Sequence, residues 1–104
     1  MTNLIRNPPT IQSEGAAWNA LRKASQAGEA LVMDACRFLG RQDGRDALST
    51  RLTRYGRDWM AENPEWRERD VRNGLGTLRR QAGRELTEAE RTAFAVAMLD
   101  EFGR

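Results

Sequence analysis

Apolar side chains in this chain of 104 residues recur at intervals of three and four, and no segment alternates apolar with polar positions. Such intervals collect side chains on one face of an α-helix, whereas alternation would collect them on one face of a strand. The spacing therefore predicts an all-α fold. A chain of this length forms one core, so we expect a compact single-domain bundle over residues 14–104. Residues 1–13 are expected to form an extended or disordered N-terminal arm, because Pro8-Pro9 favours polyproline-like geometry and the segment lacks an amphipathic period.

The first predicted helix covers residues 14–39. Ser13 is a suitable N-cap, and Glu14 suits the positive end of the helix dipole. Gly28 lies inside the segment and costs about 1 kcal/mol relative to alanine in a helix. The segment therefore either continues unbroken or breaks over residues 25–28, which gives a bundle of four helices or of five. Its apolar face consists of Ala17, Ala20, Leu21, Ala24, Leu31, Val32, Ala35, Phe38 and Leu39.

Two glycines end this segment and precede the next one. Gly40 and Gly44 flank polar residues, which predicts a loop over residues 40–44. A second helix is expected over residues 45–61, with an apolar face made of Leu48, Leu52, Tyr55 and Trp59. Arg51, Arg54 and Arg57 lie off that face and are expected to form a secondary basic surface.

Asn63-Pro64 marks the start of a third helix over residues 64–82, because asparagine is a favoured N-cap and proline suits the first helical position. Gly83 then ends it. The motif Thr87-Glu88-Ala89-Glu90 is a capping box, and it predicts a last helix over residues 88–102. The inward residues of these two helices are predicted to be Val71, Leu75, Leu78 and Ala82, followed by Phe94, Ala95, Met98, Leu99 and Phe102.

The residue inventory excludes several kinds of catalytic chemistry. Histidine is absent and Cys36 is the single cysteine, so the chain lacks the residues of a Ser-His-Asp triad or of a four-ligand zinc site. Acidic residues gather between Glu62 and Asp70, but arginines are interleaved with them, and Glu68 with Arg72 has the spacing of a helical ion pair. We therefore expect a protein that is not an enzyme and that holds neither a metal nor a cofactor.

Cellular location is predicted from the same inventory. One cysteine allows no internal disulfide, which favours a reducing compartment, and Cys36 is expected to be a buried apolar side chain. The N-terminus lacks the pattern of a secretory signal. The longest largely apolar, uncharged run, residues 92–99, is far shorter than the roughly 20 residues that span a bilayer. These features predict a cytoplasmic protein without a membrane partner.

Charge points to the third helix as the candidate binding surface. Residues 37–84 contain twelve arginines and seven acidic residues, whereas the segment from Glu85 onward is acidic. A helical wheel places a set of polar residues on the outward side of the third helix, around Gly76. The predicted partner-binding residues are Trp66, Arg69, Arg72, Asn73, Gly76, Arg79 and Arg80.

Two of these residues each allow two interpretations. Gly76 is either a notch that a partner's backbone or a phosphate approaches, or a sign that the helix is irregular around residues 73–76. Trp66 is either an exposed anchor for a partner or, as we favour, a side chain that folds back over Trp59 and the preceding helix.

Two functions fit these predictions. The first is a small regulator or inhibitor that binds a larger protein or nucleoprotein complex through this face, by analogy with small modulators carried by phages and plasmids; a homodimer through a helix face would also fit. The second is a helix-turn-helix DNA-binding protein with residues 64–82 as the recognition helix. A formal net charge of only +2 and the interleaved acidic residues favour the first.

Overall fold

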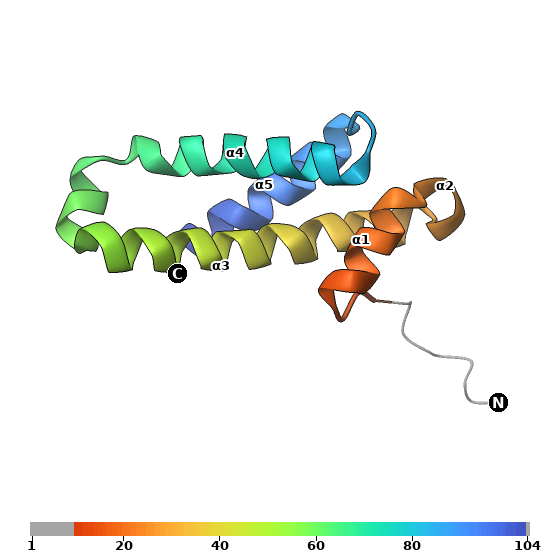
Figure 1. Ribbon diagram of the computed structural model, residues 1–104, viewed down its shortest axis with the longest axis horizontal. Helices are drawn as coiled ribbons and strands as arrows, with labels where there is room; N and C mark the ends of the chain where they lie inside the picture. The colour runs from red at the N-terminus through yellow and green to blue at the C-terminus, as the bar shows by residue number, and fades with distance from the viewer. Residues whose placement is uncertain (1–9, 104) are drawn as a thin grey trace.

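The computed structural model describes residues 10–103 and contains five helices within that range (Figure 1). They are α1 (Glu14–Arg22), α2 (Ala24–Ala27), α3 (Glu29–Glu62), α4 (Glu65–Ala82) and α5 (Glu88–Phe102). The described residues contain no strand, which confirms the all-α prediction. Most of the predicted arm, residues 1–9, lies outside the described residues. Its last part is not helical, and there the backbone amide of Ile11 donates to Asp34 Oδ2 over 2.7 Å.

The segment predicted as one helix over residues 14–39 breaks at Lys23 and again at Gly28, so the five-helix alternative is confirmed. Gly28 has a φ of 92° and a ψ of 151°, a conformation that is accessible essentially only to glycine. Ser13 caps α1 as predicted, because its hydroxyl accepts from the amide of Ala16 over 3.1 Å. The chain reverses at Gly28 and places α1 against the first part of α3 (Figure 1).

The loop predicted over residues 40–44 was wrong, because α3 runs through it without interruption. Gly40 and Gly44 lie one turn apart on the side of α3 that faces α5. A Cβ on Gly40 would collide with the carbonyl oxygen of Phe94, and a Cβ on Gly44 would lie 2.8 Å from the Cβ of Glu101. The two glycines therefore allow the backbones of α3 and α5 to approach closely, and they do not form a turn.

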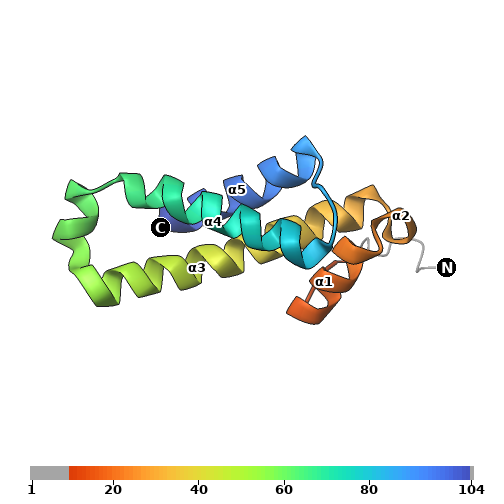
Figure 2. The same cartoon turned by 45° about the horizontal axis from the view of Figure 1, so that its top comes forward.

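Helix α3 bends sharply before it ends. Gly56 has a φ of 86° and a ψ of 166°, so the short helical segment after it leaves in a new direction. Asn63 was predicted to cap the next helix but instead closes this one, because its Nδ2 donates to the carbonyl of Trp59 over 2.9 Å. Helix α4 then runs back beside α3 in the antiparallel sense, as Figures 1 and 2 show.

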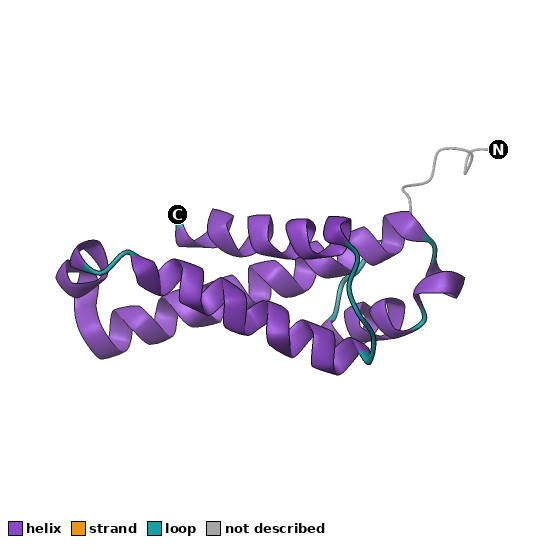
Figure 3. Ribbon diagram, turned by 90° about the horizontal axis from the view of Figure 1, so that it is seen from above, coloured by secondary structure: helices purple, strands orange, loops and turns teal. Residues whose placement is uncertain are grey.

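Helix α5 completes the bundle by packing mainly against α3 and secondarily against α4. The capping box is present as predicted: Thr87 Oγ1 accepts from the amide of Glu90 over 3.1 Å, and Glu90 Oε1 accepts from that of Thr87 over 2.8 Å. Gly83 ends α4 in the left-handed conformation, at a φ of 76°. Seen from above, the loops of the described part are short connections between helices (Figure 3).

The core lies where α1, α3, α4 and α5 meet. Its largest fully buried side chains are Trp66, Phe94, Leu21, Leu78, Met98 and Cys36. Three residues of the predicted apolar faces are exposed, and one of them is Leu99, which is 45% exposed on the outer side of α5. Leu52 and Tyr55 of α3 are also exposed, at 39% and 42%. In the described part of the chain, no helix has the length and apolarity needed to cross a membrane.

Candidate interaction surface on helix α4

The arginine-rich side of α4 is exposed, as predicted. Around Gly76, the positions three and four residues away in each direction are Arg72, Asn73, Arg79 and Arg80, and all four are exposed. Arg69 lies one turn before Arg72 and is exposed as well. We call these residues together with Gly76 the α4 arginine face. The helix is regular through this segment, so the interpretation that it is locally irregular around residues 73–76 was wrong.

The two glycines of α4 have different surroundings. A Cβ on Gly74 would lie 3.0 Å from the Sδ of Met98 and 3.0 Å from the ring of Phe94, so close packing against α5 explains glycine there. A Cβ on Gly76 would meet only the Arg80 guanidinium, at 3.5 Å. This guanidinium is the far end of a flexible side chain and can move away. Packing against the described residues therefore gives no reason for glycine at position 76.

Acidic and polar neighbours bind several guanidinium groups of this face. Arg72 lies 3.6 Å from Glu68, which confirms the predicted pair, and Arg79 lies 3.1 Å from Glu85. Arg80 donates to the hydroxyl of Thr77 over 3.1 Å. Ion pairs this exposed contribute about 0–1 kcal/mol, so a partner can displace them at little cost. The same pairs lower the positive potential that the face presents to a polyanion.

Trp66 does not belong to this surface. Its side chain is 0% exposed and packs against Phe102, with ring centroids 4.7 Å apart, while the guanidinium of Arg67 covers its ring. The interpretation of Trp66 as an exposed anchor was therefore wrong. The indole folds inward as we favoured, although its ring contact is with α5. A residue in the first turn of a helix can turn a long side chain under the helix end, and a helical wheel does not show this.

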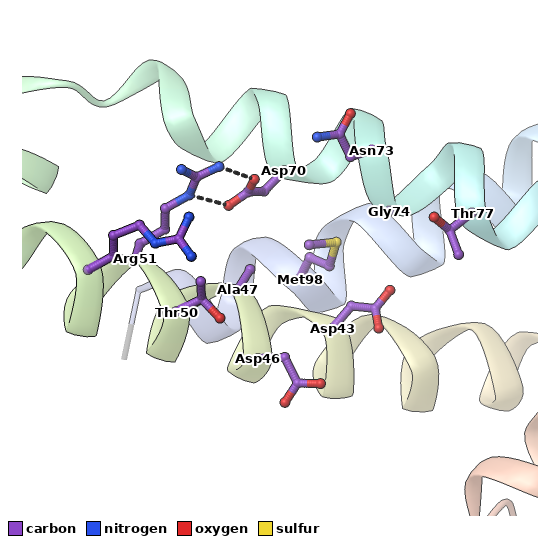
Figure 4. A pocket seen from close by; sticks show the side chains of 11 residues that line it. Asp43, Asp46, Ala47, Thr50, Arg51, Asp70, Asn73, Gly74, Thr77 and Met98 are labelled. Atoms are coloured by element: carbon purple, nitrogen blue, oxygen red, sulfur yellow. Dashed lines mark hydrogen bonds and ion pairs between the residues drawn. The ribbon is translucent and has the colours of Figure 1, made fainter.

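A polar groove of about 400 Å³ lies between α3 and α4, next to the α4 arginine face (Figure 4). Sequence reasoning missed this groove, because its walls come from two helices and the sequence does not show that these helices pair. Met98 of α5 forms part of the floor. The other lining residues are Asp43, Asp46, Ala47, Thr50, Arg51 and Arg54 from α3, and Asp70, Asn73, Gly74 and Thr77 from α4.

An ion pair between Arg51 and Asp70 crosses the groove at one end. Arg51 Nη2 donates to Asp70 Oδ1 over 2.7 Å, and Arg51 Nε donates to Asp70 Oδ2 over 3.1 Å, so the pair is bidentate (Figure 4). Hydrogen bonding to Asp70 raises the pKa of Arg51 further above its ordinary value. This pair fixes α4 against α3 and neutralises the charge of Arg51. Arg54 is then the groove's cation without an ion-pair partner within 4 Å among the described residues.

The other end of the groove is acidic. Burial raises the pKa of Asp43 to about 6, and repulsion by Asp46 and Glu14 adds to the shift. The prediction of a secondary basic surface made of Arg51, Arg54 and Arg57 needs correction here. Arg51 and Arg54 line the groove, whereas Arg57 lies on another side of the molecule, in a shallow depression with Leu48, Leu52, Met60 and Phe102. The bend at Gly56 causes this separation.

Neither a metal-ligand cluster nor a reactive thiol is present among the described residues. Over residues 10–103, no group of three or more histidine, cysteine, aspartate or glutamate side chains could hold a metal ion. Cys36 is buried, as predicted, and desolvation by burial raises the pKa of its thiol to about 12. A thiol in that state is neutral and unreactive at physiological pH.

Comparisons with protein-family models, with curated proteins and with solved structures each gave no match to this chain. The candidate surface has three distinguishing features. It combines an exposed arginine face, a helix position open to close approach, and an adjoining groove with charges of both signs.

Proposed function

We propose that this protein is a non-enzymatic binding protein of the cytoplasm, and that it regulates or inhibits a larger protein or nucleoprotein complex by docking the α4 arginine face on it. The observation that carries the proposal is Gly76. Gly76 lies in the middle of α4 among exposed arginines, and there is room at this position for a larger side chain. Glycine inside a helix lowers helix stability by about 1 kcal/mol relative to alanine. Close approach by a partner's backbone gives a reason to keep it.

The charge arrangement supports a protein partner over a nucleic acid. Arg72 and Arg79 already pair with acidic residues, and Glu65 and Glu68 are exposed on the same helix. A surface of mixed sign suits a protein surface of mixed sign, whereas phosphate binding needs an excess of positive charge.

The arrangement of the helices does not favour the helix-turn-helix alternative. A recognition helix crosses the helix before it at a large angle and protrudes from it. Here α4 lies antiparallel to the long first part of α3 and shares a groove with it (Figure 1). DNA binding is therefore the second candidate function, and nuclease treatment distinguishes it from protein binding.

Purification of a tagged copy from its host, with and without nuclease treatment, tests the proposal. We expect a companion protein at a fixed ratio that survives nuclease and that is lost with Arg79→Glu/Arg80→Glu. The matched control is Lys23→Glu/Arg57→Glu, which changes the net charge equally at exposed positions outside the α4 arginine face. Recovery of nucleic acid, with companions lost on digestion, would overturn the proposal in favour of DNA binding. If both double variants lost the companion protein equally, binding would depend on the net charge of the protein and not on the α4 arginine face.

Gly76→Ala tests the close approach directly. The added methyl group has room in the free protein and favours helix, so we expect the free energy of unfolding to rise by about 0.5–1 kcal/mol. Affinity for the companion should fall about tenfold, because a misfit of one methyl at a packed contact costs 1–3 kcal/mol. Gly15→Ala, at an open position in α1, should stabilise without weakening binding. Unchanged affinity in Gly76→Ala would contradict the docking geometry.

A further inference from the structure

Helix α5 is apolar on two sides, and only one of them is covered. Its inner side carries Phe94, Ala97 and Met98, which pack against α3 and α4. On its outer side, uncharged residues follow each other at intervals of three, four, three and four, the spacing of a helix-pairing seam. We call this set the outer stripe of α5. It consists of Ala89, Thr92, Val96, Leu99 and Gly103.

The outer stripe exposes large apolar side chains at its centre and small residues at its ends. Val96 is 51% exposed and Leu99 is 45% exposed, one turn apart. Leu99 and Val71 of α4 also line an apolar depression beside the stripe, so the apolar surface continues onto α4. An apolar helix face of this kind is expected to be covered in the functional state.

Charges of opposite sign flank the stripe on its α3 side. A shallow groove there is lined by Arg37, Arg41, Thr92, Val96 and Asp100, together with Ala93 and Ala97. Arg37 and Asp100 are both exposed, and neither has an ion-pair partner within 4 Å among the described residues. Both charges are therefore available to a molecule that covers the stripe.

We infer that the outer stripe of α5 binds a second copy of this chain, with the two α5 helices antiparallel and a two-fold axis at Val96. Residues equally far before and after Val96 then face each other. Val96 meets Val96, Thr92 comes opposite the Leu99 region, and the small residues Ala89 and Gly103 meet at each end. The stripe is thus complementary to itself, as a two-fold interface requires.

The flanking charges agree with this pairing. The antiparallel arrangement brings Asp100 of one copy opposite Thr92 of the other, and Thr92 lines the same groove as Arg37. A two-fold axis repeats this contact, so each copy places its Asp100 beside the other's Arg37. The same axis places the α3 helices of both copies on one side of the paired α5 helices, which is the side that carries Arg37 and Asp100. A partner without an acidic group at the matching position would leave Arg37 unpaired.

Sedimentation equilibrium of the full chain tests the inference. We expect a dimer with twice the 11.8 kDa mass of the monomer. Its dissociation constant should lie in the micromolar range, because each copy contributes only one helix and the residues beside it. Val96→Asp should weaken dimerisation at least a hundredfold. The change is at an exposed position, so its circular dichroism should match that of the unchanged protein. Leu52→Asp, at an exposed apolar position on α3, is the control and should dimerise normally.

Two further variants separate this pairing from other associations. Asp100→Arg should weaken the dimer, and Arg37→Asp/Asp100→Arg should restore it, because the exchanged charges still face each other. Val96→Cys should form an intermolecular disulfide on mild oxidation, while the buried Cys36 does not react. A monomer at several hundred micromolar, or a dimer that Val96→Asp leaves intact, would overturn the inference. Arg79→Glu/Arg80→Glu should still dimerise, so this result is independent of the α4 arginine face.

Discussion

At the scale of single residues, Asp43 is the clearest case of a side chain held in an unfavourable state. It lies on the α3 wall of the polar groove, where burial and the nearby carboxylates of Asp46 and Glu14 raise its pKa from 3.8 to about 6. The folded protein therefore binds the Asp43 proton more tightly than the unfolded chain does. Above pH 6 the ionised carboxylate lowers stability, and between pH 6 and about 4 this penalty disappears as the pH falls.

Asp43→Asn should accordingly raise the free energy of unfolding by about 1–2 kcal/mol at pH 7.5, less than the full shift implies because solvent still reaches the carboxyl. The gain should shrink steadily toward pH 4. Urea unfolding of both proteins across this range measures the difference, in which contributions from other titrating groups cancel. Asp46→Asn removes one of the charges that raise the pKa of Asp43, so it should give a gain of the same sign and smaller size. A gain that is constant with pH would show that Asp43 does not titrate near pH 6.

At the scale of helices, the close approach of α3 and α5 depends on glycine. Gly40→Ala would place a methyl group against the Phe94 carbonyl and the Ala97 side chain, and backbone there cannot move without separating the helices. We expect a loss of about 2–3 kcal/mol in the free energy of unfolding, even though alanine is the better helix former. Gly15→Ala, with open space at its Cβ, should instead be neutral or stabilising. Equal effects of the two substitutions in thermal unfolding would contradict the packing explanation.

The same glycines show what the sequence could and could not predict. Apolar periodicity, the capping box at Thr87 and the ends at Ser13 and Gly83 were enough to predict an all-α bundle of four or five helices, the start of α1 and the bounds of α4 and α5 to within one residue. The loop over residues 40–44 was wrong, because a glycine pair that allows helices to cross has the same local pattern as a turn. Only the partner helix distinguishes the two cases, and the sequence does not show which helix lies opposite.

The candidate site divides in a similar way. Exposure of Arg72, Arg79 and Arg80 follows from helical spacing alone, so the sequence could predict it. The groove beside them could not be predicted, because its walls come from α3 and α4 and depend on how these helices pair. Trp66 is buried against Phe102, so its place among the predicted binding residues was wrong, because a helical wheel gives the direction of the Cα–Cβ bond and not the course of a long side chain.

At the scale of the whole molecule, Arg84 joins three parts of the bundle. It lies in the loop after α4, where Nη2 donates to the carbonyl of Leu21 at the end of α1 over 3.1 Å and to Glu90 of α5 over 2.8 Å. Its Nη1 donates to the other carboxylate oxygen of Glu90 over 2.9 Å. Glu90 is buried, and hydrogen bonding to Arg84, followed by the Thr87 amide, lowers its pKa. One side chain thus caps α1 and fixes it to the start of α5.

Glu90→Gln removes the countercharge of Arg84 while it keeps the size of the side chain. We expect a loss of about 2–3 kcal/mol, below the range for fully buried pairs because the Arg84 side chain is 31% exposed. Amide hydrogen exchange should show faster opening of α1 in the variant, because the Leu21 carbonyl loses a well-positioned donor.

The pH dependence gives a separate check on this pair. A lowered folded-state pKa for Glu90 means that its stabilisation is complete above the ordinary glutamate pKa and is lost as the pH falls through the folded value. The difference between the unchanged protein and Glu90→Gln should therefore narrow in acid, opposite in sign to the Asp43 effect. Glu88→Gln, an exposed change in the same helical turn, should cost only a few tenths of a kcal/mol. If both glutamine variants lost stability equally, the contact between Arg84 and Glu90 would stabilise the protein no more than a single acidic charge at the start of a helix does.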